Sequence, residues 1–168
     1  MKGLICFFLF LIPARALTQS DSTSISVSNP GYRIIYHGTK LKPEETTYSI
    51  TVVVTDIRNT NGTIRFKFYD DTTPFPHDTG FLKVVVDKSE VVNGTLTKTF
   101  YGFKSQNMAI ALLDDENNDV KLEMGWFLPK EGHAFSDYFH AALRRPVYSD
   151  FKFFLKGDKK VIMKMKYY

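Results

Sequence analysis

Apolar and polar side chains alternate with a period of two in several stretches, and this pattern restricts the fold more than any other feature. In residues 63–70, Ile64, Phe66 and Phe68 occupy every second position between more polar neighbours. Successive side chains of a strand point to opposite faces, so such a stretch predicts a strand with one buried face. Residues 48–57 and 81–88 repeat the pattern, with apolar rows made of Ile50, Val52, Val54, Leu82, Val84 and Val86.

Turn residues separate the strand candidates at regular intervals. Asn61-Gly62 and Asn93-Gly94 suit tight turns that need a positive φ, and Gly157-Asp158 lies between residues 150–156 and 159–167. We therefore expect one hairpin around Asn61-Gly62 and a last hairpin around Gly157-Asp158. Residues 107–113 are apolar on both faces, as in a strand in the middle of a sandwich.

No helical period of useful length accompanies these strands, and the chain is rich in Val, Ile, Thr, Phe and Tyr. The expected fold is all-β: an antiparallel β-sandwich of about seven to eight strands over residues 47–168. Residues 17–46 are rich in Ser and Thr and are expected to form a polar lead-in, with one short strand near 24–28. Residues 120–127 are expected to continue as a strand or as an extended arm.

The first 16 residues resemble a secretory signal peptide. Lys2 gives a positive start, residues 4–12 form an apolar run too short to span a bilayer, and Ala14-Arg15-Ala16 has the small residues of a cleavage site. Cleavage after Ala16 would release an exported protein, periplasmic or secreted, with no transmembrane segment in the mature chain. An uncleaved anchor is the alternative.

Cysteine content and charge narrow the chemistry. The only cysteine, Cys6, lies inside the expected signal peptide, so the mature chain has no disulfide, thiol chemistry or cysteine-based zinc site. Cleavage also removes Lys2 and Arg15 and no acid, so the formal net charge falls from +4 to +2. Nucleic-acid binding needs a clustered basic surface, and so weak a surplus predicts no nucleic-acid partner.

Residues 112–126 (LLDDENNDVKLEMGW) hold the densest cluster of carboxylates and amides. Calcium prefers oxygen ligands at alternate positions of a loop, which here predicts a site made of Asp115, Asn117, Asp119, the Lys121 carbonyl and Glu123. Val120 replaces the glycine of an EF-hand loop and Trp126 replaces its closing glutamate, so another loop would have to complete the shell. The alternative is a plain polar turn without metal, because Asp and Asn are good turn residues.

Strand order predicts which acids could complete that site. If every strand reverses direction, the loops at 59–62, 90–94, 114–119 and 157–158 lie at one end of the sandwich. Asp70 and Asp71 would then lie at the opposite end, and we expect them to take no part in the Asp115 site.

The segment after the acidic loop concentrates aromatic and arginine side chains, which are typical of binding surfaces. It predicts a ligand site for an unknown protein or carbohydrate, built from Trp126, Phe127, Phe135, Tyr138, Arg144 and Arg145. The alternative is that the long connection folds over the sandwich and buries the same aromatic side chains as core.

Catalysis is not expected. His37, His77, His133 and His140 show no metal-binding spacing. Ser136-Asp137, near His133 and His140, keeps a small hydrolase as an outside alternative, but the chain has no G-x-S-x-G elbow.

Four motifs give the chain a family resemblance: GTIRFKFYD, DDENNDVKLE, PKEGHAFS and FKFFLKGDKKVIMKMKYY. Together they resemble an exported bacterial family, the domain of unknown function twenty-one forty-one, over about residues 48–168. The resemblance implies a small secreted sandwich of immunoglobulin-like or transthyretin-like type, and it implies no activity. The acidic loop departs from the family pattern: Asp114 stands in place of a histidine, Asn118 and Val120 in place of glycines, and Asp119 in place of an asparagine.

The sequence thus predicts an exported, cysteine-free β-sandwich that is not an enzyme and that acts by binding. No cofactor is certain, and calcium is the possible one. Two functions remain open: a binding module with its ligand on the aromatic segment or the loop-rich end, and a calcium-stabilised structural or adhesion domain.

Overall fold

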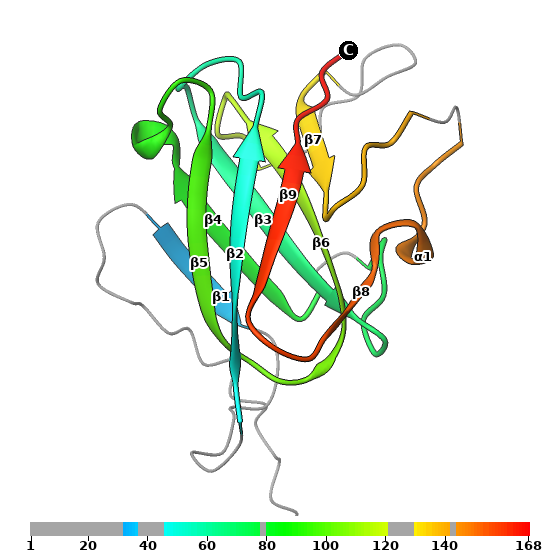
Figure 1. Ribbon diagram of the computed structural model, residues 1–168. Coiled ribbons are helices and arrows are strands. Elements are labelled where there is room, and N and C mark those ends of the chain that lie inside the picture. The colour runs from blue at the N-terminus through cyan, green and yellow to red at the C-terminus, as the bar shows by residue number, and fades with distance from the viewer. Residues whose placement is uncertain (1–31, 37–45, 78–79, 121–129, 142–143) are drawn as a thin grey trace, which may run out of the picture.

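The computed structural model describes residues 32–36, 46–77, 80–120, 130–141 and 144–168 (Figure 1). These residues form two packed β-sheets with almost no helix, so the all-β sandwich prediction is confirmed. The strands are β1 (Tyr32–Tyr36), β2 (Tyr48–Thr55), β3 (Thr63–Asp70), β4 (Leu82–Asp87), β5 (Leu96–Phe103), β6 (Gln106–Asp115), β7 (Gly132–Phe135), β8 (Phe153–Leu155) and β9 (Lys159–Lys164). Two short helices interrupt them: the 3₁₀ turn η1 (Lys88–Glu90) and the single turn α1 (Tyr148–Phe151).

The larger sheet has the order β1-β4-β3-β6-β7, and β8 also pairs with β6. The smaller sheet has the order β5-β2-β9. Every pairing is antiparallel except β2 with β9, which run parallel with Ile50 opposite Lys159 and Thr55 opposite Lys164. Figure 1 shows the smaller sheet in front of the larger one, with β9 beside β2.

The two expected hairpins are wrong. β2 belongs to the smaller sheet and β3 to the larger, so the connection around Asn61-Gly62 crosses from one sheet to the other. β8 and β9 are likewise divided between the sheets. Alternation states which side chains face the core, and that pattern is the same whether the next strand pairs alongside or lies in the opposite sheet.

The same crossing corrects the expected position of Gly157-Asp158. Asp158 Oδ1 accepts a hydrogen bond from the Ser49 backbone N–H at 2.8 Å, near the start of β2. The other three expected loops do meet at the far end of β2. We call this end the loop pole; it comprises residues 56–62, 88–95 and 114–120.

The main core lies between the two sheets. The predicted inward rows of β2, β3 and β4 are all buried, and Phe68 packs against Phe81, Phe100 and Phe103 with ring centroids 5.2–6.4 Å apart. Burying one such side chain contributes about 1.5–3 kcal/mol, so these rows stabilise the sandwich.

A second, smaller core covers the outer face of the larger sheet. Ala109 and Ala111 of β6 are buried there together with Tyr69, Phe135 and Phe151. β6 is therefore buried on both faces, as its sequence predicts. The chain after β7 folds back over this face and brings α1 against it (Figure 1).

Several expectations fall outside the described residues: the signal peptide at 1–16, the strand near 24–28, and most of the strand or arm at 120–127. Within the lead-in, β1 pairs with β4, so the larger sheet begins before residue 47. Among the described residues, no helix has the length and apolar character needed to cross a membrane.

Candidate functional site

The loop pole gathers three connections that are far apart in sequence. The Ile57 N–H donates to Gly94 O at 2.9 Å, and Lys88 Nζ donates to Asn59 Oδ1 at 2.9 Å. Gly62 has φ +73°, and a Cβ there would lie 2.0 Å from Asp115 O. Only glycine lets the crossing connection approach the end of β6 so closely.

A fully buried ion pair lies at the centre of the loop pole. Lys88 Nζ lies 2.7 Å from Asp114 Oδ1, and neither side chain is exposed. The Tyr167 hydroxyl donates to Asp114 Oδ2 at 2.6 Å, so both carboxylate oxygens are bonded. Burial raises the pKa of Asp114, while the hydrogen bonds from Lys88 and Tyr167 oppose that shift.

A second ion pair closes the pole at its surface. Arg58 donates two hydrogen bonds to the Glu116 carboxylate, at 2.6 and 2.7 Å, and Asn59 donates a third at 2.8 Å. The bond from Arg58 is the main cause that lowers the pKa of Glu116. The Arg58 guanidinium also lies 4.4 Å from the centroid of the Tyr167 ring. The Glu116 carboxylate is thus engaged by Arg58 and Asn59 and does not join the carboxylates that could bind a metal.

The loop after β6 wraps around the Asp115 carboxylate. Asp115 Oδ1 accepts from the Asp119 N–H and Oδ2 from the Val120 N–H, both at 3.1 Å. Arg65 Nε also donates to Oδ2. Asn118 and Val120 have φ values of +59° and +69°. Val120, a β-branched residue, thus takes the left-handed conformation that a calcium loop gives to glycine.

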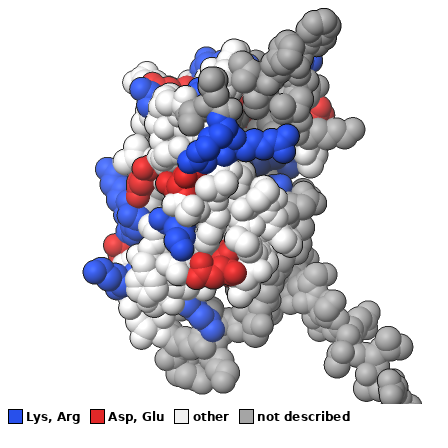
Figure 2. All heavy atoms as spheres, turned by 90° about the vertical axis from the view of Figure 1, so that its right-hand side faces the viewer, with Lys and Arg blue, Asp and Glu red and all other residues white. Residues whose placement is uncertain are grey.

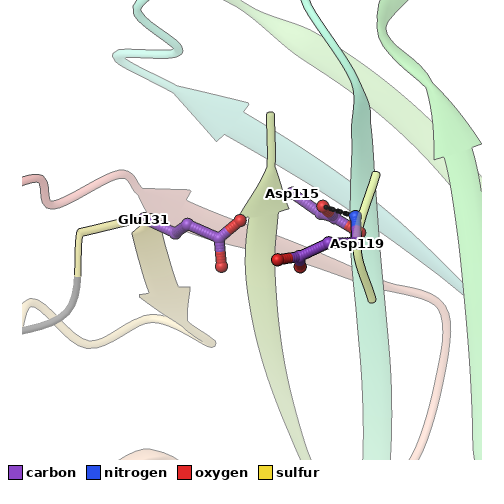
Figure 3. A group of neighbouring side chains, drawn as sticks. All are labelled: Asp115, Asp119 and Glu131. Atoms are coloured by element: carbon purple, nitrogen blue, oxygen red, sulfur yellow. Dashed lines mark hydrogen bonds between the residues drawn. The ribbon is translucent and has the colours of Figure 1, made fainter. Parts of the chain in front are cut away.

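Three carboxylates converge beside this loop. Asp115, Asp119 and Glu131 each place one carboxylate oxygen within 4.8 Å of the others. Figure 3 shows the Glu131 and Asp119 carboxylates pointing toward one another, with Asp115 behind them. Asp115 and Glu131 are buried and Asp119 is exposed, so the cluster opens to solvent on one side. Among the described residues this is the one group of three potential metal ligands.

The cluster shares two members with the predicted calcium set. Asp115 and Asp119 are brought together, whereas Asn117 Nδ2 donates to Asp119 Oδ2 at 3.2 Å and its Oδ1 accepts from the Asp119 N–H. Lys121 and Glu123 lie outside the described residues. Asp70 pairs in register with Met108, at the opposite end of β6, so the expectation that Asp70 and Asp71 take no part is confirmed.

Glu131 was missed because no sequence pattern predicted the pairing that places it. β7 pairs with β6 so that Gly132 lies opposite Asp114, which brings Glu131 next to Asp115. Gly132 is itself required, since a Cβ there would lie 2.2 Å from the Tyr167 ring. The Glu131-Gly132 pair of the family motif was the available signal.

The predicted aromatic site is divided by the structure. Phe135 is 6% exposed and belongs to the second core, as the alternative interpretation of that segment predicts. Tyr138 packs partly against the same core, and Arg144 is engaged by Asp150 through two hydrogen bonds at 2.6 and 2.7 Å. Arg145 is exposed, and Trp126 and Phe127 lie outside the described residues.

The Ser136 hydroxyl both donates and accepts a hydrogen bond, and both partners are backbone groups. Its Oγ donates to Phe151 O at 2.7 Å and accepts from the Ile110 N–H at 3.0 Å. His140 accepts at Nδ1 from the Tyr138 hydroxyl and donates from Nε2 to Arg144 O. This serine therefore ties the segment after β7 to β6, and His140 stabilises the same segment.

The fold and the loop pole together define a small β-sandwich with an acidic cluster where β6 ends and β7 begins. A bacterial family described as "Uncharacterized protein conserved in bacteria (DUF2141)" matches residues 52–163, and the chain belongs to this family. The match runs from β2 to β9, so it includes the main core and the loop pole. No curated protein and no solved structure matches the chain.

Proposed function

We propose that this protein is an exported β-sandwich that acts by binding rather than by catalysis, and that a calcium ion stabilises its loop pole. The observation that carries the calcium proposal is the convergence of Asp115, Asp119 and Glu131 within 4.8 Å. Calcium takes six to eight oxygen ligands, and protein carboxylates are its commonest partners. Backbone carbonyls and water would complete the shell on the open side of the cluster.

The loop conformation supports calcium over a plain turn. A calcium loop makes a sharp turn at the sixth position, five residues after the first acid, and a glycine stands there. Asp115 accepts from Val120 in that position, and Val120 adopts a positive φ although its side chain disfavours it. A bound cation gives a physical reason for holding this strained loop in place.

Charge supports the same conclusion. The three carboxylates of the cluster carry three negative charges, and Arg65 beside Asp115 supplies one positive charge. Like charges this close repel unless a cation neutralises them. A divalent ion would offset this repulsion and would join the end of β6 to the start of β7.

Thermal unfolding with calcium and then with chelator tests the calcium site. At one hundred times the dissociation constant, bound calcium should stabilise the fold by about 2.7 kcal/mol, a shift of several degrees. Glu131→Gln and Asp119→Asn should abolish the shift. Glu90→Gln is the matched control, because Glu90 lies at the same pole outside the cluster. Coinciding curves with and without calcium would refute the site.

Export rests on the pattern of the first 16 residues, and N-terminal sequencing of the protein recovered outside the cytoplasm tests it. A mature chain that begins at Leu17 supports export, and an intact Met1 contradicts cleavage.

The binding role rests on the exposed part of the segment after β7, since its Phe139 is 49% exposed. The proposal of no catalysis is supported by Ser136, whose one hydroxyl proton is donated to the Phe151 carbonyl and whose oxygen accepts from the Ile110 N–H.

A further inference from the structure

A pocket outside the loop pole lies between β9 and the turn that follows β7. Its volume is about 320 Å³, and its lining residues are Asp137, Tyr138, Phe139, Ile162 and Lys164. Ligand sites are concave and mostly apolar, with a few polar groups that fix orientation. Two aromatic rings, one aliphatic side chain, one acid and one amine match that description.

The turn is fixed to the strand by Asp137. Its backbone N–H donates to Ile162 O at 2.9 Å, and its Oδ1 accepts from the Ile162 N–H at 2.8 Å. Asp137 therefore satisfies both backbone groups of Ile162 on β9, and it does so with a φ of +50°. A non-glycine residue held in the left-handed region by such contacts gives the pocket a rigid wall.

The apolar wall of the pocket, made of Phe139 and Ile162, is exposed to solvent instead of being buried in either core. Ile162 is 43% exposed and Phe139 is half exposed, whereas Phe135, four residues earlier, is buried. The Tyr138 hydroxyl bonds to His140, which holds the neighbouring ring in place. Lys164 and Lys166 place their ammonium groups 5.6 and 5.9 Å from the centroid of the Phe139 ring.

The charge around this wall is positive. Asp137 is paired with Lys159 at 3.0 Å, and Lys164 is 3.7 Å from Asp56 with both side chains mostly exposed. Three lysines (Lys159, Lys164 and Lys166) therefore lie near two acids (Asp56 and Asp137). The ion pair of Lys164 with Asp56 is long and exposed, so it holds Lys164 weakly. Figure 2 shows the face turned to the right in Figure 1, where basic side chains form a band above the centre and acidic side chains lie next to its lower end and below the centre.

We propose that this pocket binds a sugar residue that carries a carboxylate, such as one uronic acid unit of an acidic polysaccharide. The apolar face of the sugar ring stacks on Phe139 and Ile162, and its carboxylate pairs with the Lys164 ammonium. Tyr138 and Phe139 come from the aromatic segment expected from the sequence, whereas Ile162 and Lys164 come from β9. The inference rests on the proposed binding role and is independent of the calcium site.

Titration of the purified protein with galacturonic acid trisaccharide, followed by calorimetry and by NMR shifts, tests this assignment. Saturable binding at millimolar concentration or below is expected, and it should weaken as salt rises, since ion pairs at an exposed site are screened. Phe139→Ala and Lys164→Gln should each weaken binding at least tenfold. The titration is done once with calcium and once with chelator. Loss of sugar binding under both conditions would then count against the pocket alone and not against the calcium site.

Two matched variants provide controls. Tyr101→Ala removes an aromatic ring that is 79% exposed on β5, the far strand of the smaller sheet, and Lys160→Gln removes one charge from β9 outside the pocket lining. Both should bind the trisaccharide as the parent does. The proposal is overturned by an absence of saturable binding, by equal binding of neutral galactotriose, or by equal losses in the control variants.

Discussion

Lys88 and Asp114 form an ion pair with neither side chain exposed, Nζ lying 2.7 Å from Oδ1. One charge comes from the 3₁₀ turn after β4 and the other from the end of β6, so the pair joins two parts of the loop pole. Asn59 and Tyr167 supply the remaining hydrogen bonds. Removing either partner leaves a buried charge with no counter-ion.

Lys88→Met should therefore destabilise the fold by about 3–5 kcal/mol, the usual cost of an uncompensated buried charge. Urea unfolding followed by circular dichroism measures the change. Lys98→Met is the control, because Lys98 pairs with Glu90, whose side chain is 45% exposed, and pairs at the surface contribute about 0–1 kcal/mol. Equal losses in the two variants would show that burial of the Lys88 pair is unimportant.

Gly62→Ala should destabilise the loop pole, because the added Cβ would lie 2.0 Å from the Asp115 carbonyl oxygen and φ is +73°. Alanine at a positive φ costs more than about 1 kcal/mol, and here the backbone of the β3–β6 end must also move. Gly157→Ala is the comparison, since nothing lies within 4 Å of a Cβ there. The unfolding midpoint should fall for the first variant and stay within experimental error, or rise slightly, for the second.

Val120→Gly should stabilise the acidic loop, because glycine adopts the φ of +69° without the steric cost that valine meets. A gain of about 0.5–1 kcal/mol is expected, together with tighter calcium binding if the proposed site is correct. Val92→Gly should do the opposite, since Val92 is similarly exposed but has no positive φ. A loss of stability in Val120→Gly would contradict the strained conformation.

Arg144 should control the titration of Asp150. Two hydrogen bonds from Arg144 are the main cause that lowers the pKa of Asp150 to about 2, from an ordinary value of 3.8. Since the folded pKa is depressed, the stabilisation is present above pH 3.8 and is lost as the pH falls toward 2. Carboxylate NMR shifts should show this pKa, and Arg144→Gln should raise it. Asp158, whose pKa is lowered by Ser49, should titrate unchanged in that variant.

The sequence predicts burial in this protein better than it predicts neighbours. Ile64, Phe66 and Phe68 are buried as their alternation requires, yet β3 does not pair with β2. An alternating strand buries the same face against either partner, so local pattern carries no information about the crossing at Gly62. The parallel pairing of β2 with β9 has no local signal either.

The candidate metal site likewise has one part that the sequence predicts and one part that it does not. Asp115 and Asp119 are close in sequence, and their spacing predicts their proximity. Glu131 comes from the other side of a long connection and reaches the site only because Gly132 pairs with Asp114. The Phe139 pocket depends on Asp137 bonding to the edge of β9, a contact between residues 25 positions apart.

The parallel pair of β2 and β9 also sets the order of events during synthesis. β2 is the central strand of its sheet, and one of its two neighbours is the last strand of the chain. The smaller sheet cannot be completed before β9 has left the ribosome, and contacts of such long sequence separation form slowly. The growing polypeptide therefore keeps one side of β2 unpaired, and the main core open beside it, until β9 has also been made.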